Sequence, residues 1–303
     1  MNRRKFIKNT TYSGTGLFIS NQLIPVSEQK PKGDESYDIM KEVKKYRKID
    51  AHAHVYFTDE SPGIQIDFAD RLHIDKLMIS RAMAPHSKGT PEEFKKCNDL
   101  VLKSMNQYPD RFIGMPVVNP VYAKESLEEI DRCLDLGMVG IGELYNHIKI
   151  NDPLYYPIIE KYIDLKMIIH MHSAIGYSRV KLNSREPKNI SLPEDFVDIA
   201  MRYPEAMFQF AHLGGGIDWE YACKTIQNCP NIYVDVSGSN NESKIIEFAL
   251  EYLGEDRIFF GCDNSFYQGV GHMLSAKLTD KQRRKIFFDN YNNILKKSGN
   301  HVD

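Results

Sequence analysis

The chain has 303 residues, of which 42% are hydrophobic, so it is long enough for one large domain or two small ones. The formal net charge of −2 gives no indication of a nucleic-acid partner or of an anionic membrane surface. The five cysteines lack a CxxC spacing, which disfavours a disulfide framework or a thiolate zinc site, and no apolar run reaches the ~18 residues of a membrane helix.

The N-terminus differs from the rest of the chain. "MNRRKFIKNTTYSGTGLFIS" places Arg3 and Arg4 before an apolar pair and a lysine, which resembles a twin-arginine export signal; a disordered basic tail is the alternative. Residues 25–45 are polar and charged, as is typical of a linker. We therefore expect a signal and linker over residues 1–45, a folded domain over 46–303, and export to the periplasm, or a cytoplasmic location if the signal does not function.

The stretch "KIDAHAHVY" (48–56) predicts the first strand and a candidate metal site. His52 and His54 are two positions apart, so both imidazoles point to the same side of a strand. Two neutral imidazoles on one wall form a chelating pair for a divalent metal. Two hydrogen-bonded histidines near a surface turn are the alternative.

Eight short apolar runs follow one another along the chain, and several are nearly continuous, as in parallel strands covered on both faces. The predicted strands are residues 48–54, 73–80, 111–118, 138–144, 167–173, 206–213, 231–238 and 257–264.

Helical patterns separate most of these runs, at residues 90–110, 123–137, 193–205 and 241–256. In the first pattern, Thr90 and Glu93 stand at capping-box spacing. Eight strand–helix units predict an α/β protein with a closed (β/α)8 TIM barrel, and no dinucleotide or P-loop signature follows the first strand.

Chemically active side chains gather at the carboxyl ends of the predicted strands, where such barrels carry their active sites. Taken alone, a buried histidine or carboxylate is more often a core side chain with its hydrogen bonds formed than a metal ligand. The residues are His52, His54, Glu143, His170, His172, His212 and Asp263, with Asp235 on the seventh strand.

In this order the motifs resemble those of the amidohydrolase superfamily, over residues 48–298. The first-strand pair resembles that superfamily's metal pair, and aligning "IIHMHS" with its fifth strand places His172 at the ligand position, with His170 one strand repeat deeper. "FAHLGGG" resembles the sixth strand of the amidohydrolase-2 (amidohydrolase-related) branch. "FFGCDNSF" resembles its eighth-strand Gly-Thr-Asp, with Cys262 in place of threonine.

The resemblance implies a metal-dependent hydrolase with one or two divalent ions, zinc above all. The implied metal ligands are His52, His54, His172 and Asp263. Asp263 would also accept the proton of an activated water that attacks an ester, lactone or amide carbonyl, and His212 would polarise the attacked oxygen or orient the substrate.

The role of Glu143, in "VGIGEL", determines how many metal ions we expect. The motif resembles the strand of TatD-like hydrolases that carries a metal-bridging glutamate, and Gly140 and Gly142 let this strand pass close to its neighbour. If Glu143 bridges, we expect two ions. Otherwise it would bind the substrate or the water of a single ion, or form a salt bridge to a Lys or Arg of the barrel.

Two other functions remain open: nonoxidative decarboxylation of an unsaturated or aromatic acid, as in several amidohydrolase-2 proteins, and metal binding without catalysis. The expected partner is a small-molecule substrate, and a homo-oligomer is possible. Loops at 55–70 and 174–192 are expected to shape the pocket. Arg179 and Tyr177 could meet an anionic substrate or belong to a surface loop.

Overall fold

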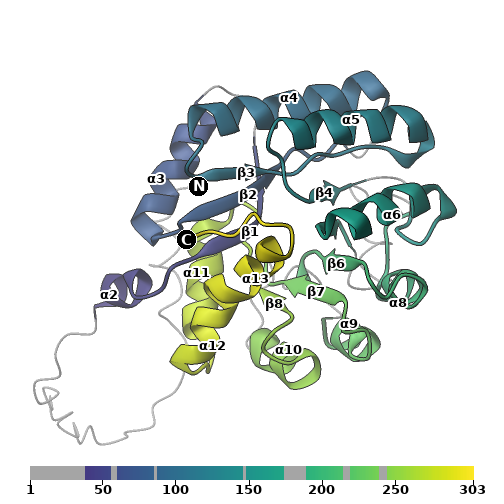
Figure 1. Ribbon diagram of the computed structural model, residues 1–303. Coiled ribbons are helices and arrows are strands. Elements are labelled where there is room, and N and C mark those ends of the chain that lie inside the picture. The colour runs from purple at the N-terminus through teal and green to yellow at the C-terminus, as the bar shows by residue number, and fades with distance from the viewer. Residues whose placement is uncertain are drawn as a thin grey trace, which may run out of the picture. The chain divides into compact units, whose positions relative to one another are not determined.

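Helices and parallel strands alternate from Ile39 to the C-terminus, and this part of the chain forms one compact unit (Figure 1). The computed structural model describes residues 38–55, 60–84, 87–145, 148–173, 189–213, 219–238 and 244–303. The export signal, Tyr177 and Arg179 lie outside these residues.

All eight predicted strands form, each shorter than its apolar run, which confirms the predicted order of elements. The strands are β1 (Ile49–His54), β2 (Lys76–Ser80), β3 (Phe112–Gly114), β4 (Ile141–Leu144), β5 (Ile168–Met171), β6 (Met207–Phe210), β7 (Ile232–Asp235) and β8 (Ile258–Phe259).

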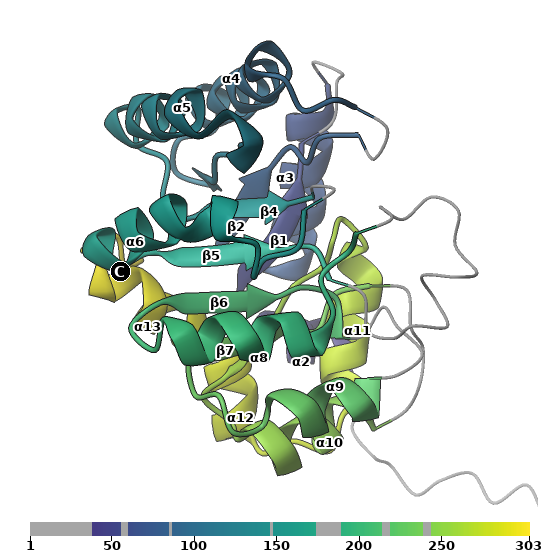
Figure 2. The same ribbon diagram turned by 90° about the vertical axis from the view of Figure 1, so that its right-hand side faces the viewer.

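The strands pair in parallel as two sheets, β1-β2-β3 and β4-β5-β6-β7-β8. Backbone hydrogen bonds join the sheets at both seams. Beside β3 and β4, Val139 N–H donates to Gly114 O (2.8 Å); beside β8 and β1, Ala51 N–H donates to Phe260 O (2.9 Å). The eight strands therefore form the ring of a TIM barrel, with helices around it (Figures 1 and 2).

Helices connect the strands. In α4 the capping box forms as predicted, since Glu93 N–H donates to the Thr90 hydroxyl and Thr90 N–H to the Glu93 carboxylate. No helix among the described residues is both long and apolar enough to cross a membrane. The helices are α2 (Ile39–Lys44), α3 (Ser61–Leu72), α4 (Pro91–Gln107), α5 (Ala123–Asp135), α6 (Tyr156–Leu165), α8 (Pro193–Arg202), α9 (Trp219–Ile226), α10 (Ile245–Leu253), α11 (Phe266–Ser275), α12 (Asp280–Arg284) and α13 (Asn290–Lys297), with short helical turns η2 (Pro120–Tyr122), η3 (Pro153–Tyr155) and η5 (Lys285–Asp289).

Two predicted irregular segments contain helices instead. The linker expected through residue 45 ends in α2, because buried Val43 anchors that turn and Lys45 and Tyr46, just beyond it, both bind Asp280. The loop expected over 55–70 contains most of α3.

The helix α3 forms because Gln65, Ala69 and Leu72 are buried at helical spacing.

An apolar layer closes one end of the barrel. It includes Ile49, Ile168 and Met207, the first residues of β1, β5 and β6, together with Tyr291 of α13. The candidate site residues lie at the opposite end, where the strands finish.

Candidate metal centre

The two histidines of β1 share one space, as their spacing predicts. Their Nε2 atoms lie 3.2 Å apart, and His52 is fully buried. Asp263, which follows β8, places Oδ1 3.3 Å from Nε2 of His54 and 4.0 Å from Nε2 of His52. These three side chains form the first donor group of the site.

A second donor group lies at the ends of the neighbouring strands. His172 follows β5 and His212 follows β6, and Nδ1 of His172 lies 3.0 Å from Nε2 of His212. His212 has a positive φ of 62° and Asp263 one of 46°, a backbone conformation that non-glycine residues seldom adopt and that is frequent at functional sites.

Glu143 at the end of β4 lies between the two groups and turns one carboxylate oxygen to each. Oε2 is 3.1 Å from Nε2 of His54 and 3.5 Å from Nε2 of His52. Oε1 is 2.7 Å from Nδ1 of His172 and 3.0 Å from Nε2 of His212. Glu143 is buried and paired with four imidazoles, so the geometry favours a position inside the site over a salt bridge to Lys or Arg.

The glycines of this strand explain its position. A Cβ on Gly142 would lie 2.0 Å from the carbonyl oxygen of His170 on the next strand, and one on Gly140 would lie 3.2 Å from that of Ile168. Only glycine lets β4 approach β5 this closely, as the sequence predicts.

The donor spacing fits a first-row divalent cation. Ligand bonds of about 2.1 Å place neighbouring ligand atoms roughly 3.0–3.4 Å apart in octahedral or tetrahedral geometry. The separations within the two donor groups and around Glu143 are mostly in this range. Imidazole nitrogens combined with carboxylates suit zinc, manganese or iron better than calcium.

Charges within the cluster shift its titration in the metal-free protein. Burial would raise the pKa of Glu143, but the imidazoles of His172, His52 and His212 outweigh burial and hold that pKa well below its usual value. Burial also opposes ionisation of Asp263, yet the hydrogen bond to His54 and the surrounding imidazoles lower its pKa to about 2. Both carboxylates are therefore ionised at neutral pH.

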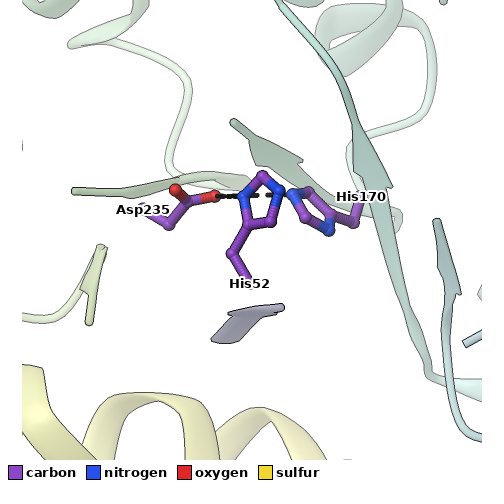
Figure 3. A group of neighbouring side chains, drawn as sticks. All are labelled: His52, His170 and Asp235. Atoms are coloured by element: carbon purple, nitrogen blue, oxygen red, sulfur yellow. Dashed lines mark hydrogen bonds and ion pairs between the residues drawn. The ribbon is translucent and has the colours of Figure 1, made fainter. Parts of the chain in front are cut away.

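The structure separates His170, within β5, from His172, directly after it, a choice of ligand that the sequence left open. His172 faces Glu143 and His212, whereas His170 lies deeper, fully buried beside His52 and Asp235 (Figure 3). The geometry thus places His172 between Glu143 and His212, as expected for the histidine that the alignment puts at the ligand position, while that assignment itself stays a prediction.

Sequence reasoning missed two polar side chains that hold β1. The hydroxyl of Ser80, the last residue of β2, is 3.1 Å from Nδ1 of His54 and accepts a hydrogen bond from Glu143 N–H. Asn264 binds both the N–H and the C=O of His54. The sequence could have indicated both, because Ser80 is a polar residue at the end of a predicted strand and Asn264 directly follows Asp263.

A pocket of about 160 Å³ lies next to the donor groups, between the segments that follow β2, β3 and β4. Its wall includes Met83, Val121 and Tyr145, and the Tyr145 ring packs edge-on against His172 at 4.1 Å between centroids. A wider cavity of about 870 Å³ opens at the opposite end of the barrel. It is lined by residues around the starts of β1 to β4 and by residues 300–303, and it has no part in this site.

A family model described as Amidohydrolase (Amidohydro_2) matches residues 49–290. Among curated proteins, a 2-amino-3-carboxymuconate-6-semialdehyde decarboxylase of Dictyostelium discoideum is 24% identical over 213 residues, 60% of this chain and 58% of that enzyme. A 2-keto-4-carboxy-3-hexenedioate hydratase of Sphingobium sp. (strain NBRC 103272 / SYK-6) is 28% identical over 106 residues, 30% of this chain and 31% of the hydratase. The matches span less than two thirds of either relative.

Two solved structures have the same fold. One is a TIM-barrel protein from Bordetella bronchiseptica, with a TM-score of 0.64, 15% identity and coverage of 84% of this chain and 99% of that one. The other is a dihydroxybenzoic acid decarboxylase from Polaromonas sp. JS666 with bound manganese and the inhibitor 2-nitroresorcinol, with a TM-score of 0.62, 16% identity and coverage of 83% and 97%.

Proposed function

The chain belongs to the amidohydrolase family, and we propose that it is a metal-dependent lyase that removes carbon dioxide from an unsaturated or aromatic carboxylic acid. The curated relative from Dictyostelium and the Polaromonas structure are both named as decarboxylases of such acids. They support this alternative better than the hydrolysis of an ester, lactone or amide that the motifs first suggested. A donor set assembled from five strand ends argues against a protein that only stores metal.

The position of Asp263 carries the proposal. It is the most exposed member of the cluster, with 36% of its side chain accessible, while its oxygens remain 3.3 Å from Nε2 of His54 and 3.9 Å from Nδ1 of His212. It therefore stands between the buried donors and an incoming substrate. A carboxylate ionised at neutral pH first accepts a proton, from solvent or from an acidic group of the substrate, and then has one to deliver.

Nonoxidative decarboxylation needs one proton at one carbon. The bond to the carboxylate carbon breaks, its electron pair stays on the ring or alkene carbon, and Asp263 delivers the proton to that same carbon. A divalent cation, when bound, supplies a Lewis acid that draws charge from a carboxylate or hydroxyl oxygen of the substrate. His212, beside Asp263, orients the substrate from the neighbouring strand end.

We place the substrate's carbon frame in the pocket beside Tyr145. Met83 and Val121 give this pocket apolar walls suited to a planar ring or diene, and Lys88 at its edge offers a positive charge for a second acidic group. Arg81, directly after β2, lies at the same end of the barrel and donates Nη1–H to the carbonyl of Val55.

The two oxygens of Glu143, one facing each donor group, support two cation positions bridged by this carboxylate. His52, His54 and Asp263 would hold one cation, and His172 and His212 the other. Zinc remains our first expectation, and manganese is the ion in the Polaromonas enzyme.

A substrate screen tests the proposal. Protein loaded with zinc or manganese should release CO₂ from hydroxybenzoic acids or from unsaturated carboxylic acids, and the same reaction in D₂O should place one deuterium on the carbon that lost the carboxylate. Chelator-treated protein serves as the control. Hydrolysis of esters, lactones or amides without CO₂ release would overturn the lyase assignment, as would addition of water to an unsaturated acid, the reaction of a hydratase.

A further inference from the structure

His52 has a second polar partner that the donor groups do not include. Its Nε2 faces Glu143 and His54, whereas its Nδ1 lies 3.2 Å from Oδ2 of Asp235, the last residue of β7 (Figure 3). A neutral imidazole carries one ring proton. If that proton is on Nδ1 and is donated to Asp235, the lone pair of Nε2 is left for a metal.

Asp235 is fully buried and surrounded by donors. Oδ2 also accepts a hydrogen bond from the Gln209 side chain (2.9 Å), and Oδ1 accepts from the backbone N–H groups of Ser237 (3.2 Å) and His212 (3.3 Å) and from the Ser237 hydroxyl. An ionised carboxylate only accepts hydrogen bonds, so the direction of each of these contacts is fixed.

The Ser237 hydroxyl extends this arrangement to a second ligand candidate. Because its proton points to Asp235, its oxygen is free to accept a hydrogen bond from Nδ1–H of His212, 3.0 Å away. The Nε2 lone pair of His212 then faces Glu143 and His172. One buried carboxylate is thus linked to a histidine of each donor group.

We propose that Asp235 and Ser237 are positioning residues that hold His52 and His212 as the Nδ1–H tautomer, and so prepare Nε2 of both for metal. The inference rests on the metal site of the proposed function, not on the reaction. The alternative is that His52, His170 and Asp235 hold a cation of their own, since Nε2 of His170 lies 3.4 Å from Oδ2 of Asp235 and its ring packs edge-on against His52.

Nuclear magnetic resonance of histidine ring nitrogens in zinc-loaded protein tests the proposal without substrate. His52 and His212 should both be protonated at Nδ1 and bind the metal through Nε2. Ser237→Ala should change the tautomer of His212 more than that of His52, because Nδ1 of His52 loses a contact of 3.2 Å with the Ser237 hydroxyl but keeps Asp235. Ser237→Thr should restore the tautomer of His212, and Asp235→Asn should disturb both histidines. Ser80→Ala is the matched control, because Ser80 contacts only His54 among these histidines.

Zinc titration against a competing chelator gives the second measurement. Loss of such outer hydrogen bonds typically weakens metal binding roughly 10–100-fold. Ser237→Ala should lower the affinity for one zinc equivalent to this extent. Asp235→Asn should lower the affinity for every zinc equivalent that binds. His170→Gln should keep all bound equivalents. A wild-type protein with His52 or His212 protonated at Nε2 instead would overturn the proposal whether or not any variant folds, and so would loss of one zinc equivalent in His170→Gln.

Discussion

The imidazole of His54 makes the stability of the metal-free protein depend on pH. Burial would lower its pKa, but hydrogen bonds to Asp263 and Glu143 outweigh burial and raise the pKa to about 8, against about 6.5 in an unfolded chain. A raised pKa stabilises the fold while the group is protonated. This stabilisation is complete below about pH 6.5 and is lost as the pH rises through about 8. A shift of about 1.5 units corresponds to about 2 kcal/mol in the free energy of unfolding.

Urea unfolding of chelator-treated wild type and His54→Gln at about pH 6 and about pH 9 measures this contribution. Between these two pH values the free energy of unfolding of wild type should fall by about 2 kcal/mol more than that of the variant. Subtracting the pH dependence of the variant from that of wild type cancels the contributions of other titrating groups. Lys48 is one, because burial lowers its pKa to about 8, and Asp50 is another, because burial raises its pKa to about 7. An identical pH dependence in the two proteins would refute the reasoning.

Three further predictions concern the site and the signal. Asp263→Asn should lower kcat by roughly 10²–10⁴ in the CO₂-release assay while substrate still binds, as for loss of a general acid–base group; near wild-type kcat would make Asp263 structural. Zinc titration of apoprotein should saturate at two equivalents in wild type and at one in Glu143→Ala, and one equivalent in both would exclude bridging. Arg3→Lys/Arg4→Lys should keep the protein out of the exported fraction on cell fractionation; equal distribution of the two proteins would end the export hypothesis.

The order of strands was predictable because it depends on local apolar runs. Their lengths were less so. The run at 257–264 forms only the two-residue β8, because pairing with β7 ends at Phe259 and the chain turns at Asp263 and Asn264, which take positive φ angles. Such a turn depends on contacts with β1, including the hydrogen bond from Asp263 N–H to His52 O, and no local pattern encodes them.

The candidate site was predictable to the extent that its residues end strands. Parallel strands bring those ends together, so His54, His212 and Asp263 could be grouped without distances. The contacts of the residues deeper in the barrel could not be predicted in the same way, because they depend on how far each strand is shifted along its neighbour. Asp235 and Ser237 have the same i, i+2 spacing as the β1 histidines, and that spacing was the overlooked signal.

The seam between β8 and β1 joins residues that are synthesised far apart in time. Asn264 binds the backbone of His54 across 210 positions of sequence, and Asp263 comes late in the chain. A ribosome that has made β1 must produce most of the domain before the first donor group exists, so a truncated or stalled product holds His52 and His54 without their carboxylate. The first donor group is therefore complete only when the ring is closed, so binding of a divalent cation at this group would report a finished barrel.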